Sequence, residues 1–161
     1  MNKLINMAIL VLVIFLVCSC VLATSPQSTD ERPFQGTFSG TIIGDQNSRA
    51  SITLNLTQHG ANVTGTATVG EGLLVYTDGF ESHGVTALPS ECLNVVGISE
   101  DANNHHLETT LITSKSGLTI GVAVADLPID CKTIRVHIKL DIPFLCKGST
   151  LNATLSRMNL L

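Results

Sequence analysis

The sequence predicts an all-β protein, a single antiparallel up-and-down β-barrel of about eight strands preceded by an N-terminal signal helix. Two observations lead to this fold class. After residue 34, apolar and polar residues alternate with a period of two through most of the chain, which is the pattern of half-buried strands. No segment after the hydrophobic leader carries the apolar stripe of an amphipathic helix. A closed barrel also removes the exposed strand edges that would invite aggregation in a chain rich in Val and Thr.

The clearest predicted strand runs from Arg49 to Gln58, where four aliphatic residues alternate with polar ones. After a turn at 58–61, the same alternation from Asn62 to Val69 completes a predicted hairpin. Asp78-Gly79 and Ser116-Gly117 are further turn signals. The other predicted strands cover residues 36–43, 107–113, 118–125, 133–141 and 151–158. A sandwich is the alternative arrangement for strands of this length and spacing.

The period of two also separates the predicted core from the predicted surface. We expect the core to include Ile52, Leu54, Leu56, Val63, Ile134, Val136 and Ile138. On the opposite face we expect Thr53, Asn55, Arg135 and His137 to contact water. The smaller inward candidates, which would either leave a cavity or fit a tapering core, are Gly40, Ala50, Gly65 and Ala67.

The first residues have the composition of a secretory leader. Lys3 supplies a short positive start, and residues 7–23 (MAILVLVIFLVCSCVLA) are almost wholly apolar. Residues 16–20 (LVCSC) fit a bacterial lipobox, which would make Cys20 the lipidated N-terminal residue. The alternatives are cleavage after Ala23 and an uncleaved anchor, although the apolar run is at the short limit for a spanning helix.

The predicted organisation is therefore a lipoprotein-type signal peptide (1–19), a polar tether (20–33) and a β-barrel domain (34–161). This predicts an exported protein of the bacterial cell envelope, held to the membrane by its N-terminal lipid, with a soluble secreted or periplasmic form as the alternative. Without Lys3 the mature chain has 8 basic and 13 acidic residues, a formal charge of −5. A nucleic-acid partner is not expected, because phosphate binding needs clustered Lys and Arg.

The stretch GTFSGTIIG…ASITLNLTQHGANVTGTATVG, from Gly36 to Gly70, resembles the opening of small secreted bacterial β-barrel proteins of the lipocalin and avidin-like type. Many of those proteins are lipoproteins of unknown function. In them, a first strand with Gly-Thr-Trp or Gly-x-Trp precedes a TLxLTQxGxxVTGT hairpin, so the resemblance implies a barrel fold rather than an activity. This chain has no Trp, and Phe38 stands at the aromatic position. The tryptophan-lined biotin pocket of avidins therefore does not carry over.

Three cysteines, Cys92, Cys131 and Cys146, fall in the predicted barrel domain. An oxidising envelope favours one disulfide among them. We predict the pair Cys131–Cys146, because the chain between these residues can run out along one strand and return. The similar contexts LPSEC and LPIDC make Cys92 with Cys131 the alternative.

Two segments hold residue types that metal sites or active sites use. His105 and His106, with Asp101 and Glu108 nearby, would suit zinc or copper, but adjacent residues of a strand point to opposite faces. Residues 76–83 (YTDGFESH) combine an acid, a base and a hydroxyl. Both segments are better explained as polar loops, so we expect no catalytic residue, no metal and no cofactor. No nucleophile elbow, HExxH motif or phosphate-binding glycine loop is present.

The predicted function is that of a non-enzymatic envelope lipoprotein. Its barrel would act as a binding module for a small apolar ligand or an envelope protein partner. A structural or assembly protein with a filled barrel is the first alternative. A metal-dependent or hydrolytic enzyme, built on one of the two polar loops, is the second.

Overall fold

The computed structural model describes residues 32–79, 84–99 and 105–158. The predicted signal peptide, Cys20 and the tether up to residue 31 lie outside these residues. Within them, no helix is both long enough and apolar enough to span a membrane.

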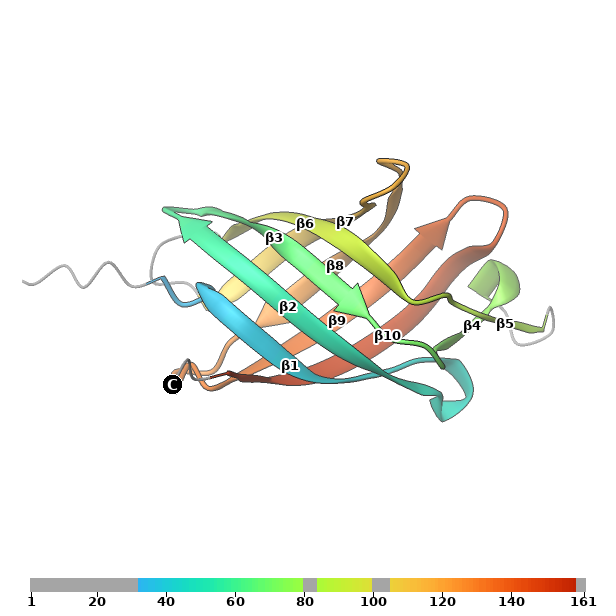
Figure 1. Cartoon of the computed structure of the whole chain (residues 1–161), viewed down its shortest axis with the longest axis horizontal. Helices are drawn as coiled ribbons and strands as arrows, with labels where there is room; N and C mark the ends of the chain where they lie inside the picture. The colour runs from blue at the N-terminus through green and yellow to red at the C-terminus, as the bar shows by residue number, and fades with distance from the viewer. Residues whose placement is uncertain (1–31, 80–83, 100–104, 159–161) are drawn as a thin grey trace, which may run out of the picture. The chain divides into compact units, whose positions relative to one another are not determined.

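Eight strands form a closed antiparallel barrel in the order β1-β10-β9-β8-β7-β6-β3-β2, which confirms the predicted fold class (Figure 1). Apart from β3–β6 and the closing pair β1–β10, neighbours in the barrel are also neighbours in the sequence, as in an up-and-down topology. The barrel strands are β1 (Gly36–Ile43), β2 (Arg49–His59), β3 (Asn62–Val69), β6 (Glu91–Ser99), β7 (His106–Thr113), β8 (Thr119–Asp126), β9 (Thr133–Ile142) and β10 (Cys146–Arg157).

The connection between β3 and β6 is the longest in the barrel and carries structure of its own. It contains the short strands β4 (Leu74–Tyr76) and β5 (Val85–Ala87), which pair with each other, and the 3-10 turn η2 (Thr77–Gly79). A second 3-10 turn, η1 (Asp45–Asn47), joins β1 to β2. These segments gather at one end of the barrel, on the right in Figure 1. We call it the cavity end, and the opposite end, where residues 60 and 61 join β2 to β3, the plugged end.

The predicted alternation is confirmed in the core. All seven predicted core residues are buried, and Asn55, Arg135 and His137 are exposed, whereas Thr53 is half-buried. The side chains that face inward from different strands form one aliphatic cluster, to which Phe34 and Phe38 add the aromatic rings. Period two therefore holds because each barrel strand has one face in this core and the other in water.

Two of the small inward residues mark close approaches between strands. A Cβ atom on Gly65 would lie 2.0 Å from the carbonyl oxygen of Asn55, and one on Gly40 would lie 2.3 Å from that of Thr154. Both glycines therefore allow a neighbouring strand to bend across them. At these two glycines the absence of a side chain allows the close approach of the neighbouring strand.

The plugged end is filled by residues that precede β1 and end β10. Phe34 is fully buried, and its N–H donates to Oε1 of Gln58, which lies 3.0 Å away. The guanidinium of Arg157 donates to the carbonyl oxygens of Pro33, Gln35 and Cys131. Three backbone segments are thereby tied together across this end of the barrel.

The predicted Cys131–Cys146 disulfide is wrong, because all three cysteines of the barrel domain are free. Cys131 lies before β9, at the plugged end, whereas Cys146 begins β10, at the cavity end. The ten residues of β9 separate them by about 33 Å along the strand, and a disulfide needs Cα atoms within about 7 Å. The turn between β9 and β10 comes directly before Cys146. Cys146 is therefore the first residue of β10, whereas a residue opposite Cys131 would have to be near the end of that strand.

The alternative pair also fails. Cys92 lies in β6 near the cavity end and faces outward, whereas Cys131 is at the plugged end. Cys146 shares the cavity end with Cys92 but is buried in the core.

Candidate functional site

An apolar cavity of about 210 Å³ occupies the cavity end of the barrel. We call it the end cavity. It is lined by aliphatic side chains from β1, β3, β6, β7, β8, β9 and β10, so it is the continuation of the barrel core toward solvent. The strand residues that line it include Ile42, Val69, Leu93, Leu111, Ile120, Leu140 and Leu151. A concave site with this lining suits an apolar ligand.

The β3–β6 connection forms part of the wall of the end cavity through Leu73, Leu88 and Pro89. We call residues 70–79 and 84–90 the cap. The backbone of the cap closes on itself where the N–H of Leu88 donates to the carbonyl oxygen of Leu73, 2.8 Å away. Leu73 is fully buried, so the cap packs on the barrel as part of the same core.

Asp45 is the main polar contact between the cap and the barrel. Its Oδ2 atom accepts the backbone N–H of Tyr76, at 2.7 Å, and the hydroxyl of Ser149 on β10, at 2.8 Å. Ser48 adds a second contact, because its Oγ accepts the N–H of Leu74 at 2.8 Å. Hydrogen bonds from both ends of η1 therefore hold the cap in place over the barrel mouth.

The middle of the barrel is packed. Between Leu54, Ala67, Leu107 and Ile134 the remaining space measures about 30 Å³, about the volume of one water molecule. The end cavity consequently has a floor of aliphatic side chains and does not run through the barrel. A ligand would enter and leave at the cavity end.

Among the described residues, Glu91 is the one carboxylate in the lining of the end cavity, and it lies at the rim. Glu91 is the first residue of β6 and pairs with Val69 of β3, at a register position whose side chains face inward. Its side chain is half-buried, and within the described residues it has no hydrogen-bond or ion-pair partner. Sequence reasoning missed this residue, because β6 itself was not among the predicted strands.

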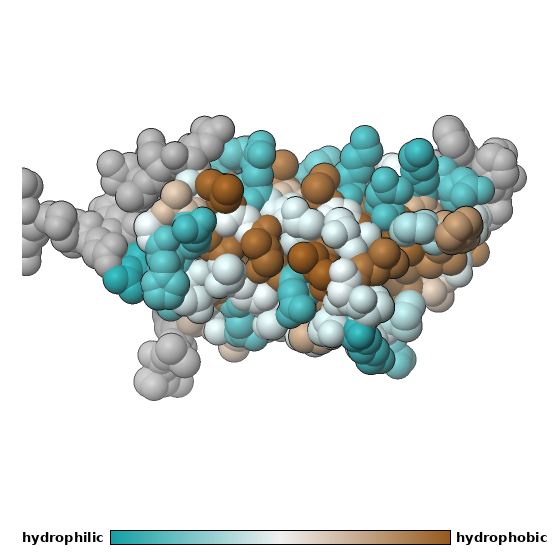
Figure 2. Space-filling view, turned by 90° about the horizontal axis from the view of Figure 1, so that it is seen from above, coloured by the Kyte–Doolittle hydropathy of each residue, from teal (hydrophilic) through white to brown (hydrophobic). Residues whose placement is uncertain are grey.

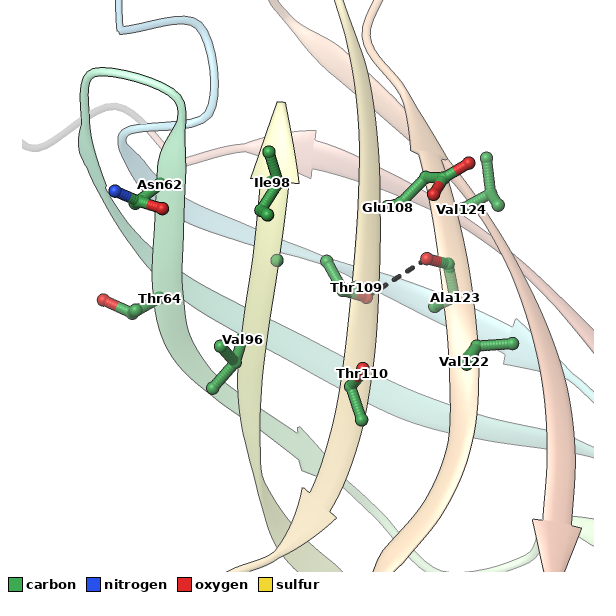
Figure 3. Close-up of a pocket in the computed structure, with 11 residues that line it drawn as sticks. Asn62, Thr64, Val96, Ile98, Glu108, Thr109, Thr110, Val122, Ala123 and Val124 are labelled. Atoms are coloured by element: carbon green, nitrogen blue, oxygen red, sulfur yellow. Dashed lines mark hydrogen bonds between the residues drawn. The ribbon is translucent and has the colours of Figure 1, made fainter. Parts of the chain in front are cut away.

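A second, larger hollow of about 670 Å³ lies on the outside of the barrel, across β3, β6, β7 and β8 (Figure 3). We call it the outer groove. Val96, Ile98 and Val122 are 50%, 61% and 53% exposed there. Figure 3 shows Val96 and Ile98 on β6 and Val122 on β8. Thr110 lies between them on β7, and Thr64 lies on β3, on the other side of β6. Figure 2 shows apolar residues scattered among polar ones along one side of the barrel. Because these three aliphatic side chains are at least half exposed, the outer groove is open to solvent along the sheet surface.

The two histidines of the predicted polar loop separate, as adjacent strand residues do. Nδ1 of His106 lies 2.7 Å from Oδ1 of Asp126, on the neighbouring strand β8. Nδ1 of His105 lies 4.0 Å from Sγ of Cys131. In the described part of the chain, no group of three or more His, Cys, Asp or Glu side chains is placed to hold a metal ion. Asp101 lies outside the described residues.

The segment 76–83 is described only up to Gly79. Thr77 and Asp78 belong to η2 of the cap, where the N–H of Thr77 donates to the carbonyl oxygen of Gly84, at 3.1 Å, and that of Asp78 donates to Leu145, at 3.3 Å. The described part of this segment is thus a turn that fixes the cap. Its His83 lies outside the described residues.

No protein-family model and no curated protein matches this chain. Among solved structures, a redesigned β-barrel superimposes with a TM-score of 0.55 at 11% identity, over 84% of this chain and 100% of the other. A de novo designed fluorescence-activating β-barrel has a TM-score of 0.48 at 10% identity, over 80% of this chain and 96% of the other. The first likeness shows the fold alone, a closed eight-stranded antiparallel β-barrel.

Proposed function

We propose that this protein is an exported envelope lipoprotein whose barrel binds one small apolar ligand in the end cavity. The observation that carries the proposal is the end cavity itself, about 210 Å³ of almost wholly aliphatic space above a packed floor. The lipocalin-like and avidin-like opening of the sequence supports the same kind of function. The leader and its lipobox support the location in the envelope.

The volume limits the size of the ligand. A buried cavity of about 150 Å³ lined by Leu, Ile and Phe accepts benzene, with six carbon atoms. By the same ratio the end cavity holds about eight carbon atoms. A ligand with an eight-carbon apolar part would fill it, and a longer chain would extend past the cap into water.

The test is calorimetric titration of the purified protein with 1-octanol. We expect saturable binding of one molecule per chain. Val69→Phe places a ring in the end cavity and is expected to abolish binding. Val96→Phe makes the same chemical change in the outer groove and is expected to leave binding unchanged. Absence of binding to the wild-type protein would exclude the proposal, and loss of binding only in Val96→Phe would move the site to the outer groove.

A structural or assembly protein is the second candidate, favoured by the packed middle of the barrel and by the exposed aliphatic residues of the outer groove. Such a protein would use the outer groove to contact an envelope partner and would have no need of the end cavity. For a structural or assembly protein we expect that octanol does not bind and that Val69→Phe stabilises the fold by filling empty space.

A further inference from the structure

In the part of the lining that the structure describes, Glu91 is the one acidic side chain, and the other residues are aliphatic apart from Thr113. The inward register positions that follow it in β6 are occupied by Leu93 and Val95, both buried. Core packing does not explain a carboxylate at an inward position of β6, because a buried charge without a partner costs free energy. Glu91 avoids that cost because it is only half-buried at the rim, between the aliphatic lining of the end cavity and solvent.

The remaining polar groups of the lining do not compete with it. The hydroxyl of Thr113 shares a hydrogen bond with Ser116 and accepts the N–H of Leu118. Arg157, the inward cation of β10, lies at the plugged end, beside Phe38. Among the described residues that line the end cavity, Glu91 is therefore the charged group that a ligand filling the cavity would contact.

We propose that Glu91 makes the end cavity selective for amphiphiles whose head group is cationic or donates hydrogen bonds, and against those with an anionic head group. This inference rests on the proposed function, since it concerns the ligand of the same cavity. An ionised carboxylate only accepts hydrogen bonds, so an ammonium or hydroxyl group is satisfied there. A second carboxylate would bring two like charges to one rim.

The experiment compares three ligands that share an eight-carbon chain: octylammonium, 1-octanol and octanoate, titrated into the purified protein at neutral pH. Attraction and repulsion at a half-exposed charge each change affinity several-fold. We therefore expect octylammonium to bind about tenfold more tightly than octanoate, with octanol between them.

Glu91→Gln keeps the size of the side chain and removes its charge, so it should reduce the difference between octylammonium and octanoate to about twofold. Glu108→Gln makes the same change in the outer groove and should leave the tenfold difference intact. Equal affinities in the wild type, or a preference that persists in Glu91→Gln, would overturn the role of Glu91 while leaving the proposed function standing. If octanol itself fails to bind, the proposed function falls, and this inference with it.

Discussion

The guanidinium carbon of Arg157 lies 4.5 Å from the centre of the Phe38 ring, so the first and last strands of the barrel meet through a cation–π contact. Both residues face inward on strands that pair directly, Phe38 on β1 with Arg157 on β10. Because this pair joins the two ends of the sheet, it lies at the seam that turns the sheet into a barrel. The pair lies at the plugged end, and the packed middle of the barrel separates it from the end cavity.

Replacing Arg157 by Met should weaken the fold. Met retains an apolar stem against Phe38 but leaves the carbonyl oxygens of Pro33, Gln35 and Cys131 without their donor. Hydrogen bonds to a charged group contribute about 1.5 to 3 kcal/mol each in mutational series, and those of one side chain are not additive. We expect the free energy of unfolding in urea to fall by about 2 to 3 kcal/mol. The control Arg135→Met, at an exposed position of β9, should change it by about 0.5 kcal/mol or less.

The two faces of β2 should respond differently to truncation. Leu56→Ala removes a buried side chain and is expected to cost about 2 to 5 kcal/mol in the free energy of unfolding. Thr57→Ala, at the next and outward position, should cost about 0.5 kcal/mol or less. Equal losses at both positions would contradict the period-two assignment of this strand.

Gly65→Ala tests the close approach of β2 and β3. The added methyl group would meet the carbonyl oxygen of Asn55 at 2.0 Å and Cα of Leu56 at 3.0 Å, both backbone atoms. The strands must separate locally, and we expect a loss of about 1 to 3 kcal/mol, as in overpacked cores. Thr64→Ala, on the exposed face of the same strand, is the control. A neutral Gly65→Ala would mean that the strands of the barrel are less tightly coiled than described.

Lipidation of Cys20 is a prediction from the leader. Cys20→Ser removes the thiol that a lipobox requires, so the protein should stay unprocessed or leave the membrane fraction. Cys18→Ser leaves Ser19-Cys20 intact and should be processed and anchored as the wild type is. The mass of the mature N-terminus and partition into detergent report the two events. A Cys20→Ser protein that is still processed as the wild type is, with Thr24 as its first residue, would favour processing after Ala23.

Local alternation was sufficient to predict most of the barrel but not β6. In β6 the inward Leu93 and Val95 are followed by the outward Val96 and Ile98. Both faces of the strand therefore carry aliphatic residues, and the alternation of apolar and polar residues is lost. Because the strand was not recognised, Glu91 was not placed on the inward face. The outer groove was missed for the same reason.

The cysteine pairing failed for a different physical reason. Spacing along the chain does not say where a hairpin turns. Here β9 continues to Ile142, and the chain reverses at residues 143–145, with Phe144 at a φ of 64°. Pairing of the two cysteines would need a turn midway between them, near residues 138–139, whereas the chain continues to residues 143–145 before it turns, directly before Cys146. Tertiary register, rather than composition, decides this feature.

The last prediction is that the barrel domain keeps three free thiols even under oxidising conditions. Cys131 stands at the plugged end, Cys146 is buried in the core at the cavity end, and Cys92 faces outward on β6. No two of these side chains can reach disulfide geometry without unfolding part of the barrel. In the folded protein we expect an alkylating reagent to modify exposed Cys92 first, half-buried Cys131 more slowly and buried Cys146 last.

Peptide mapping after alkylation in denaturant without reductant measures the outcome. Three alkylated cysteines in the domain are expected, and Cys146→Ser should leave the labelling of Cys131 unchanged. A Cys131–Cys146 peptide pair would contradict the topology itself, because it would require β9 to fold back between the two residues. A cross-link between Cys92 residues of two chains would leave the topology intact, since that thiol is exposed, and would disappear in Cys92→Ser.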